Sequence, residues 1–326
     1  MNAKEEHTSH EPTIGEPLVQ PEQNETPIQS SHKFPDADHR PTYVNLKDWI
    51  KVDSKKIPPG VYFCGVKVSR DNSTECFEIY VCSTLSVEAI TFDPQGNNFG
   101  RLLKFKPTVG ESRSWSMPMD LLAGDGAELR AELLAMGVEL DPEAAKKHLP
   151  TYIQRQHPNR QMRCVQQIGW CKDSFVLPDT VIGPNASEVI YQSGERGHEE
   201  HTQAGSLDEW RAEIAALAIG NPLLMFALSA AFAGPMLNRT NSEGGGFHFV
   251  GDSSTGKTTL IEAACSVWGG STFKRSWRAT ANGMEGVAAL FNDCLLALDE
   301  ISQCDPREVG SIIYTLGNGR GKQRAS

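Results

Sequence analysis

The sequence predicts an α+β N-terminal domain followed by an α/β core, on three observations. Short runs of alternating apolar and polar residues fill positions 43–109, which is typical of antiparallel strands separated by turns. Helical periodicity then takes over between positions 127 and 156. From position 238 onwards, an apolar strand, a glycine-rich loop, a helix and a second apolar strand alternate, and this order favours a parallel sheet.

The part before the core divides into a tail and a β-rich domain. Residues 1–42 are rich in Pro, Glu, Gln, Ser and Thr, so they carry too little apolar surface to fold, and we predict a disordered acidic tail. Residues 43–184 form the predicted α+β domain. Its expected strands are 60–66, 75–82, 89–92, 101–105, 163–170 and 173–178, and its expected helices are 127–137 and 141–156.

Residues 185–237 are predicted to be a linker and a helical connector. Ser206 and Glu209 fit a capping box that starts one helix. Asn221 and Pro222 start a second helix, which should end near Pro235. The apolar stretch is interrupted at 220–222, and neither piece approaches the roughly 20 residues that span a bilayer, so we expect a buried helical pair and no membrane segment.

Composition excludes some classes of protein. The formal charge of −10 argues against a chain coated in positive charge, although one local groove could still bind nucleic acid. The eight cysteines show no C-x-x-C pair and no metal-like Cys/His spacing, so we expect no zinc site. No basic and apolar leader follows Met1, which predicts a cytoplasmic protein with reduced thiols.

The octet GDSSTGKT at 251–258 matches the phosphate-binding pattern G-x-x-x-x-G-K-[ST] at every fixed position. An apolar run at 247–250 predicts the buried strand before it, and 259–268 the helix after it. Glycines let backbone amides point at phosphate oxygens, and the helix start adds partial positive charge. The predicted nucleotide-binding residues are Gly251, Asp252, Ser253, Ser254, Thr255, Gly256, Lys257, Thr258 and Thr259.

A second motif completes the expected site. The apolar run 291–298 predicts a strand that ends in Asp299 and Glu300. In P-loop ATPases the first carboxylate helps to hold Mg²⁺ and the second orients the attacking water. We therefore assign Thr258 and Asp299 to magnesium, and Lys257 and Glu300 to catalysis, with ATP and Mg²⁺ as the predicted cofactors.

Two segments give weaker signals. The glycine-rich stretch 317–324 carries Arg320, Lys322 and Arg324, which would contact a DNA backbone, form a solvated turn, or act on a neighbouring subunit's nucleotide. Residues 276–283 separate the two nucleotide motifs and are expected to be a structural loop. Within it, Arg278 is an alternative sensor of phosphate or of a partner.

The chain also resembles a known family in several short stretches. They are WSMPM at 115–119, LLAGDG at 121–126, IGW at 168–170, VLPD at 176–179 and the two nucleotide motifs. Over residues 43–326 it is similar to the bacterial family catalogued as domain of unknown function 927, found largely in phage, plasmid and other mobile-element proteins. The resemblance implies an AAA-like or helicase-like P-loop ATPase at 238–326, a replication helicase that acts as a homo-oligomeric ring, with 317–324 in its DNA pore.

The chain departs from that pattern at its end. It stops at Ser326 before a sensor residue, an arginine finger or a helical lid, so we expect a truncated core that hydrolyses ATP slowly or not at all. Three functions stay open. They are an ATP-driven DNA motor, a regulatory ATPase whose protein partner docks on 43–184, and a non-enzymatic remnant. ATP is the expected base because no N-K-x-D motif follows the acidic strand.

Overall fold

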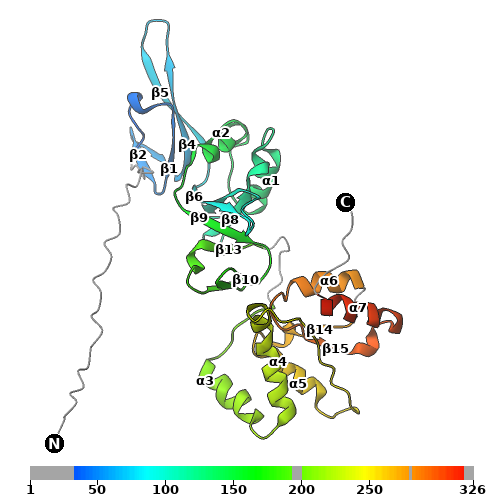
Figure 1. Cartoon of the computed structure of the whole chain (residues 1–326). Helices are drawn as coiled ribbons and strands as arrows, with labels where there is room; N and C mark the ends of the chain where they lie inside the picture. The colour runs from blue at the N-terminus through cyan, green and yellow to red at the C-terminus, as the bar shows by residue number, and fades with distance from the viewer. Residues whose placement is uncertain (1–32, 193–199, 279–280, 319–326) are drawn as a thin grey trace, which may run out of the picture.

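The computed structural model describes residues 33–192, 200–278 and 281–318. The fold is mixed α/β. A β-rich half holds the strands β1 to β13 with helices α1 and α2, and a mainly helical half holds α3 to α7 with the short strands β14 and β15 (Figure 1).

The elements of the β-rich half follow the chain in this order. They are η1 (Ala37–His39), β1 (Thr42–Leu46), β2 (Ile50–Val52), β3 (Lys55–Ile57), β4 (Gly60–Val68), β5 (Thr74–Cys82), β6 (Leu85–Phe92), β7 (Gly100–Phe105), β8 (Arg113–Pro118), η2 (Met119–Leu122), α1 (Ala127–Ala135), α2 (Pro142–Arg155), β9 (Gln161–Val165), β10 (Gly169–Cys171), β11 (Ser174–Val176), β12 (Val181–Ile182), η3 (Ala186–Glu188) and β13 (Val189–Tyr191).

A first sheet has the order β1-β4-β5 and is antiparallel throughout, which confirms the strands expected at 60–66 and 75–82. Residues just before β1, expected to belong to the tail, contact this sheet. The Phe34 ring lies 5.3 Å from the ring of Tyr62, and the Arg40 guanidinium donates to the carbonyl oxygens of Gly65 and Phe77. Phe34 and Arg40, which composition alone predicted to be disordered, therefore pack on the first sheet.

The main sheet is five-stranded and mixed, with the order β13-β9-β6-β7-β8. β6, β7 and β8 are antiparallel neighbours, whereas β9 and β13 join in parallel. Helices α1 and α2 contribute Leu129, Leu133, Leu149 and Ile153 to its core. Leu134, expected on the same face of α1, is 57% exposed, so the buried stripe of this helix is narrower than predicted.

Helix α2 begins as its sequence dictates. The Asp141 carboxylate accepts a hydrogen bond of 2.8 Å from the amide of Ala144, and Pro142 occupies the first turn. A carboxylate at this position satisfies an amide that has no partner within the helix. The prediction of a helix beginning at Asp141 and Pro142 is confirmed.

The connector begins with the expected cap. Ser206 and Glu209 form the predicted capping box, and the helix continues as α3 (Leu207–Trp210), a π turn η4 (Arg211–Ala215) and a 3-10 turn η5 (Ala216–Ala218). The side chain of Asn221 then caps α4 (Pro222–Arg239).

The predicted end of this second helix near Pro235 is wrong, because α4 continues to Arg239. Pro235 has no amide hydrogen to donate to the carbonyl of Ala231. The indole of Trp268 donates to that carbonyl instead, at 2.8 Å. The Trp268 side chain, distant in the sequence, thus supplies the hydrogen bond to the Ala231 carbonyl that Pro235 cannot make.

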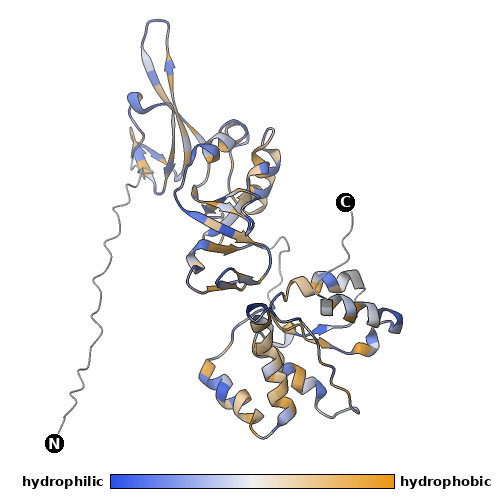
Figure 2. Ribbon diagram, in the orientation of Figure 1, coloured by the Kyte–Doolittle hydropathy of each residue, from blue (hydrophilic) through white to orange (hydrophobic). Residues whose placement is uncertain are grey.

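The expectation of a buried helical pair is also wrong. Small residues of α4, Ala227 and Ala231, are buried beside Ala264. Leu228 is buried as well, but several other large apolar side chains of the connector lie open, and Figure 2 shows hydrophobic colouring along much of α4. The exposed set includes Leu217, Ile219, Leu223, Phe232 and Met236. Within the described ranges, every helix is too short or too polar to span a bilayer.

The rest of the helical half contains α5 (Lys257–Cys265), η6 (Ser271–Phe273), β14 (Arg275–Ser276), α6 (Ala281–Ala289), β15 (Leu298–Asp299), η7 (Ile301–Gln303) and α7 (Pro306–Asn318). The helix expected after the glycine-rich loop is present as α5. Helix α6 occupies part of the predicted loop 276–283, and α7 reaches into the predicted loop 317–324.

The two strands predicted around the nucleotide motifs are mostly absent from the described structure. Residues 247–250 form no strand, and Phe247 and Val250 are 69% and 84% exposed. Of the strand expected over 291–299, only Leu298–Asp299 forms, as β15 in parallel with β14, while 291–294 is a turn. A strand needs a neighbour for its amides and carbonyls, and within the described ranges 247–250 has none.

Candidate functional site

The glycine-rich loop at 251–256 precedes α5 directly, and its residues are exposed. Ser254 and Gly256 have the positive φ angles of 62° and 89° that turn the loop into the helix. Gly256 is the N-cap of α5 and offers no capping side chain. Amides of the first helical turn, which have no intrahelical partner, are therefore available to an anion.

Lys257 lies at the first position of α5 and folds back over the loop. Its Nζ donates to the carbonyl oxygens of Gly251 at 2.7 Å and Asp252 at 2.6 Å. The Thr255 hydroxyl also donates to Asp252, at 2.9 Å. These three hydrogen bonds close a compact turn of backbone, and the Lys257 ammonium lies across its open side. A phosphate group that entered the turn would contact this positive charge.

The acidic residues lie at the end of β15. Asp299 accepts a 2.9 Å hydrogen bond from the amide of Glu300 through Oδ1. Glu300 has a left-handed φ of 60°. This conformation is uncommon for residues other than glycine, and where it occurs it is often part of a functional turn. The two carboxylates predicted from sequence are thus adjacent but carry different partners.

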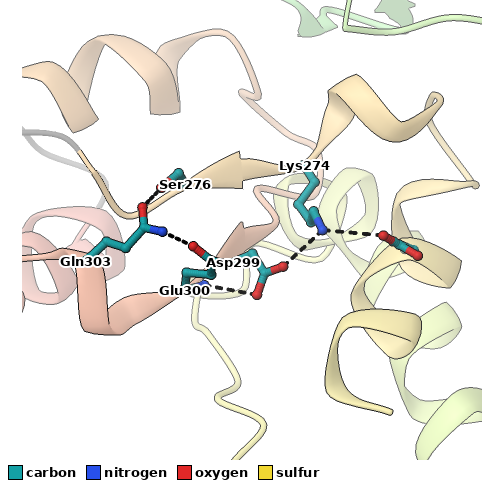
Figure 3. A network of polar contacts seen from close by, with 6 residues as sticks. Lys274, Ser276, Asp299, Glu300 and Gln303 are labelled. Carbon is teal, nitrogen blue, oxygen red and sulfur yellow. Dashed lines mark hydrogen bonds and ion pairs between the residues drawn. The ribbon is translucent and has the colours of Figure 1, made fainter. Parts of the chain in front are cut away.

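Three polar residues that sequence reasoning did not select contact this acidic pair (Figure 3). Lys274 forms an ion pair of 3.0 Å with Oδ2 of Asp299. Gln303 donates from its amide to the Glu300 carboxylate and accepts from the Ser276 hydroxyl at 3.1 Å. Pairing of β14 with β15 places Ser276 opposite Asp299. Of these three residues, only Ser276 lies on a strand, the short and polar β14. Such a short polar stretch is too weak a pattern to predict a site from the sequence alone.

Lys274 also links the acidic strand to the helix after the glycine-rich loop. Its Nζ lies 3.4 Å from Oε1 of Glu262 on α5. The Asp299 hydrogen bond is the leading cause of a raised Lys274 pKa, so this side chain stays protonated. The two predicted motifs meet through this lysine, while the two hydrogen bonds of Lys257 go to its own loop.

Oxygen donors suit the expected magnesium ion. Within the described residues, no group of three or more His, Cys, Asp or Glu side chains could hold a metal. Mg²⁺ bound with a nucleotide needs only one or two protein carboxylates because phosphates and water complete its shell. The carboxylate of Asp299 already accepts a cationic group at Oδ2. A carboxylate and a hydroxyl oxygen, which Asp299 and Thr258 carry, are donor types that Mg²⁺ takes at nucleotide sites.

A packed joint connects the β-rich half to this site. We define the joint as residues 168–170 of the β10 hairpin, Pro235 to Arg239 of α4, and the turn residues Asn292 and Asp293. Asp293 accepts from the Trp170 amide at 2.9 Å, and Asn292 donates to the carbonyl of Ile168 at 2.9 Å. The Trp170 indole donates to Pro235 at 2.7 Å. The sequence IGW therefore contacts the turn that leads to the acidic strand.

Glycine is required in the joint for space as well as for conformation. A Cβ at Gly169 would lie 2.6 Å from the Asp293 carboxylate, and the φ of this residue is 103°. On the other side of the turn, a Cβ at Gly234 would lie 2.7 Å from the Cys294 backbone. The guanidinium of Arg239 covers the Trp170 ring at 3.7 Å. The joint is close-packed from both sides.

Residues 200–202, predicted as linker, lie against the same region. The His201 ring lies 5.1 Å from Phe273 and 5.8 Å from Phe291. Burial lowers the His201 pKa to about 4, so the ring is neutral at physiological pH. The neutral His201 ring therefore packs against aromatic rings of the helical half, while Glu200 and Thr202 on either side of it make polar contacts with Arg275 and Gly270.

Two further predictions have different outcomes. Arg278 is exposed, and its amide donates to the Ser276 hydroxyl at 3.1 Å, which gives its guanidinium no described role in the site. Arg320, Lys322 and Arg324, predicted to contact DNA, lie outside the described residues.

Comparison with solved structures gives a match of the same fold. The chain is similar to a structure described as SCCmec type IV Cch, an active helicase, with a TM-score of 0.58 and 21% identity. The match covers 81% of this chain and 50% of that one, so the described chain spans about half the length of its structural relative. No curated protein matches this sequence.

Sequence comparison gives the family directly. The profile described as Domain of unknown function (DUF927) matches residues 51–326, which is most of the chain and includes both motifs and the joint. The resemblance expected from the short stretches is confirmed, and the chain belongs to the DUF927 family.

Proposed function

We propose that this chain binds ATP with Mg²⁺ at the loop 251–258 and serves as the ATPase part of a helicase-like, DNA-dependent motor of a mobile element. The observation that carries the proposal is the loop itself. Its Lys257 ammonium lies over a turn of backbone at the uncapped start of α5. An ammonium and free amides around one turn suit a chain of phosphates.

The remaining residues supply the chemistry. Lys257 exchanges its loop carbonyls for β and γ phosphate oxygens and stabilises the charge that develops there. Glu300 orients the water that attacks the γ-phosphate, and Gln303 holds its carboxylate in place before substrate arrives. Magnesium bound by Thr258 and Asp299 would neutralise phosphate charge.

The organisation of the chain is part of the proposal. It comprises a tail over 1–42, an α+β domain over 43–184, a linker and connector over 185–237 and an AAA-like core over 238–326. Arg320, Lys322 and Arg324 contact DNA, and the protein forms a homo-oligomeric ring in the cytoplasm. The solved relative described as a helicase supports this direction, since it shares the fold.

A regulatory ATPase that acts on a protein partner is the second candidate. The joint favours it, because Trp170 of the β-rich half bonds to Asp293, just before the acidic strand. A partner docked on residues 43–184 would then sense the nucleotide state through this turn. A remnant that folds without turnover is the third candidate.

ATP turnover with and without single-stranded DNA tests the proposal. We expect DNA to stimulate turnover, and Glu300→Gln to lower it about 100-fold or more while ATP still binds, because the water loses its general base. Removing Arg320, Lys322 and Arg324 together should weaken DNA binding and reduce its salt dependence.

Other outcomes of this experiment identify the alternatives. ATP-dependent capture of a protein that survives nuclease treatment, with no DNA stimulation, would support the regulatory ATPase. Binding of ATP with no turnover in the unaltered chain would support the remnant. An unaltered rate in Glu300→Gln would remove that residue from the mechanism.

A further inference from the structure

Lys274 lies between the two halves of the proposed nucleotide site. It follows η6 and comes directly before β14, and Figure 3 shows its ammonium between the Asp299 carboxylate and a second acidic side chain. That second side chain is Glu262 of α5, at 3.4 Å, whereas Asp299 is at 3.0 Å. One cation therefore contacts a carboxylate on each side.

The two ion pairs differ in exposure. The side chains of Lys274 and Asp299 are 23% and 22% exposed, whereas Glu262 is 56% exposed. A partly buried pair is screened less by water and salt than a pair on the open surface. Asp299 therefore holds the Lys274 ammonium more firmly than Glu262 does. Glu262 is the neighbouring, more solvated carboxylate to which the ammonium can shift.

Both oxygens of Asp299 have a partner in this arrangement. Oδ1 accepts from the Glu300 amide and Oδ2 pairs with Lys274. Together they fix the plane of the carboxylate on a strand end that has only one neighbouring strand among the described elements. Two carboxylates, those of Glu262 and Asp299, contact the single Lys274 ammonium, so these three side chains together carry a net negative charge.

We propose that Lys274 is an internal counter-ion of the nucleotide site, whose ammonium pairs with Asp299 while the site is empty and moves toward Glu262 when Asp299 takes a divalent cation. The inference rests on the proposed function for the identity of the site. It adds a residue outside the loop and outside the acidic strand, and it gives Glu262 a part as the receiving carboxylate.

Divalent-cation affinity tests the proposal directly. Mn²⁺ replaces Mg²⁺ as the probe and is titrated by electron paramagnetic resonance, first without nucleotide and then with ATP. Lys274→Met removes the competing charge but keeps the apolar stem, so we expect Mn²⁺ to bind about tenfold more tightly. Lys274→Arg should restore the original affinity. Lys146→Met, on the exposed face of α2, controls for the change in net charge.

Glu262→Gln provides a second variant with the opposite expected sign. The ammonium then has no receiving carboxylate, so Mn²⁺ should bind about threefold more weakly or worse, and this effect should vanish in the double variant with Lys274→Met. Because Glu262 is more than half exposed, its replacement should not unfold the protein.

The results separate this inference from the proposed function. Unchanged or weaker Mn²⁺ binding by folded Lys274→Met would overturn the role of Lys274, as would an equal effect of Glu262→Gln in both backgrounds. If the unaltered chain binds no ATP, the proposed function fails, while the titration without nucleotide still decides whether Lys274 competes for Asp299.

Discussion

Two turns in this molecule depend on glycine for different reasons. At Gly169, in the joint, a side chain would meet Asn292 and Asp293 within 3 Å. At Gly256, before α5, a Cβ would have nothing within 4 Å. Both residues have positive φ angles, 103° and 89°, but only the first is enclosed by other parts of the chain.

The difference separates a structural turn from one that is available to a ligand. In the joint, the Trp170 amide donates to Asp293 and its indole donates to the carbonyl of Pro235, so these polar groups already have partners. In the loop, open space lies beside Gly256, and Lys257 bonds to carbonyls that solvent or a ligand could replace. We expect substitutions in the joint to change stability and substitutions in the loop to change binding.

Gly169→Ala should have the largest effect on stability. The added methyl group meets the Asp293 carboxylate and forces a residue with a side chain to keep a φ of 103°. We expect the free energy of unfolding to fall by about 2 to 4 kcal/mol, from strain together with overpacking. Chemical denaturation followed by tryptophan fluorescence would measure it.

Gly124→Ala is the matched control for this change. Gly124 also has a positive φ, 65°, but a Cβ there would have nothing within 4 Å, so only the backbone cost of about 1 kcal/mol applies. Equal losses in the two variants would mean that the joint contributes no packing of its own.

The buried ring of His201 should make the stability of this region sensitive to acid. The pKa of this ring is about 4 in the folded protein and 6.5 without burial, so the unfolded chain binds more protons between these values. Stability should therefore decrease as pH falls from about 6.5 to 4. We expect a loss of about 1 to 2 kcal/mol, reduced from the full shift because the ring is partly solvated.

His201→Phe should remove this dependence, because it keeps a ring beside Phe273 and Phe291 without a titrating nitrogen. The measurement is the free energy of unfolding at pH 7 and pH 4.5 for both proteins. A decline of the same size in His201→Phe would assign the acid sensitivity to other groups.

Local signals in the sequence predicted local structure well. The caps at Asp141, Ser206 and Asn221 start helices where expected, because a cap and the amides it satisfies lie within three residues of each other. The same reasoning failed at Pro235, where the group that keeps α4 intact is Trp268, far along the chain.

Features that depend on distant partners could not be predicted in the same way. The runs at 247–250 and 291–298 are apolar like strands, but strand formation requires a neighbour that their own composition does not specify. The role of IGW at 168–170 depends on its contact with Asp293, which is 123 positions away from Trp170 in the sequence. The contact of Lys274 with Asp299 depends on the pairing of β14 with β15, which the sequence does not specify. The motif residues themselves were predicted from sequence, and their roles stay predictions.

ATP binding by the unaltered chain and by Lys257→Ala, measured calorimetrically with Mg²⁺, tests the central claim most directly. Lys257 is half-exposed on a loop that contributes little packing, so its loss should change the free energy of unfolding by less than about 0.5 kcal/mol. Because charged hydrogen bonds to phosphate are lost, ATP affinity should fall about tenfold to a hundredfold. Equal affinities in two folded proteins, or no binding by the unaltered chain, would contradict a nucleotide site at this loop.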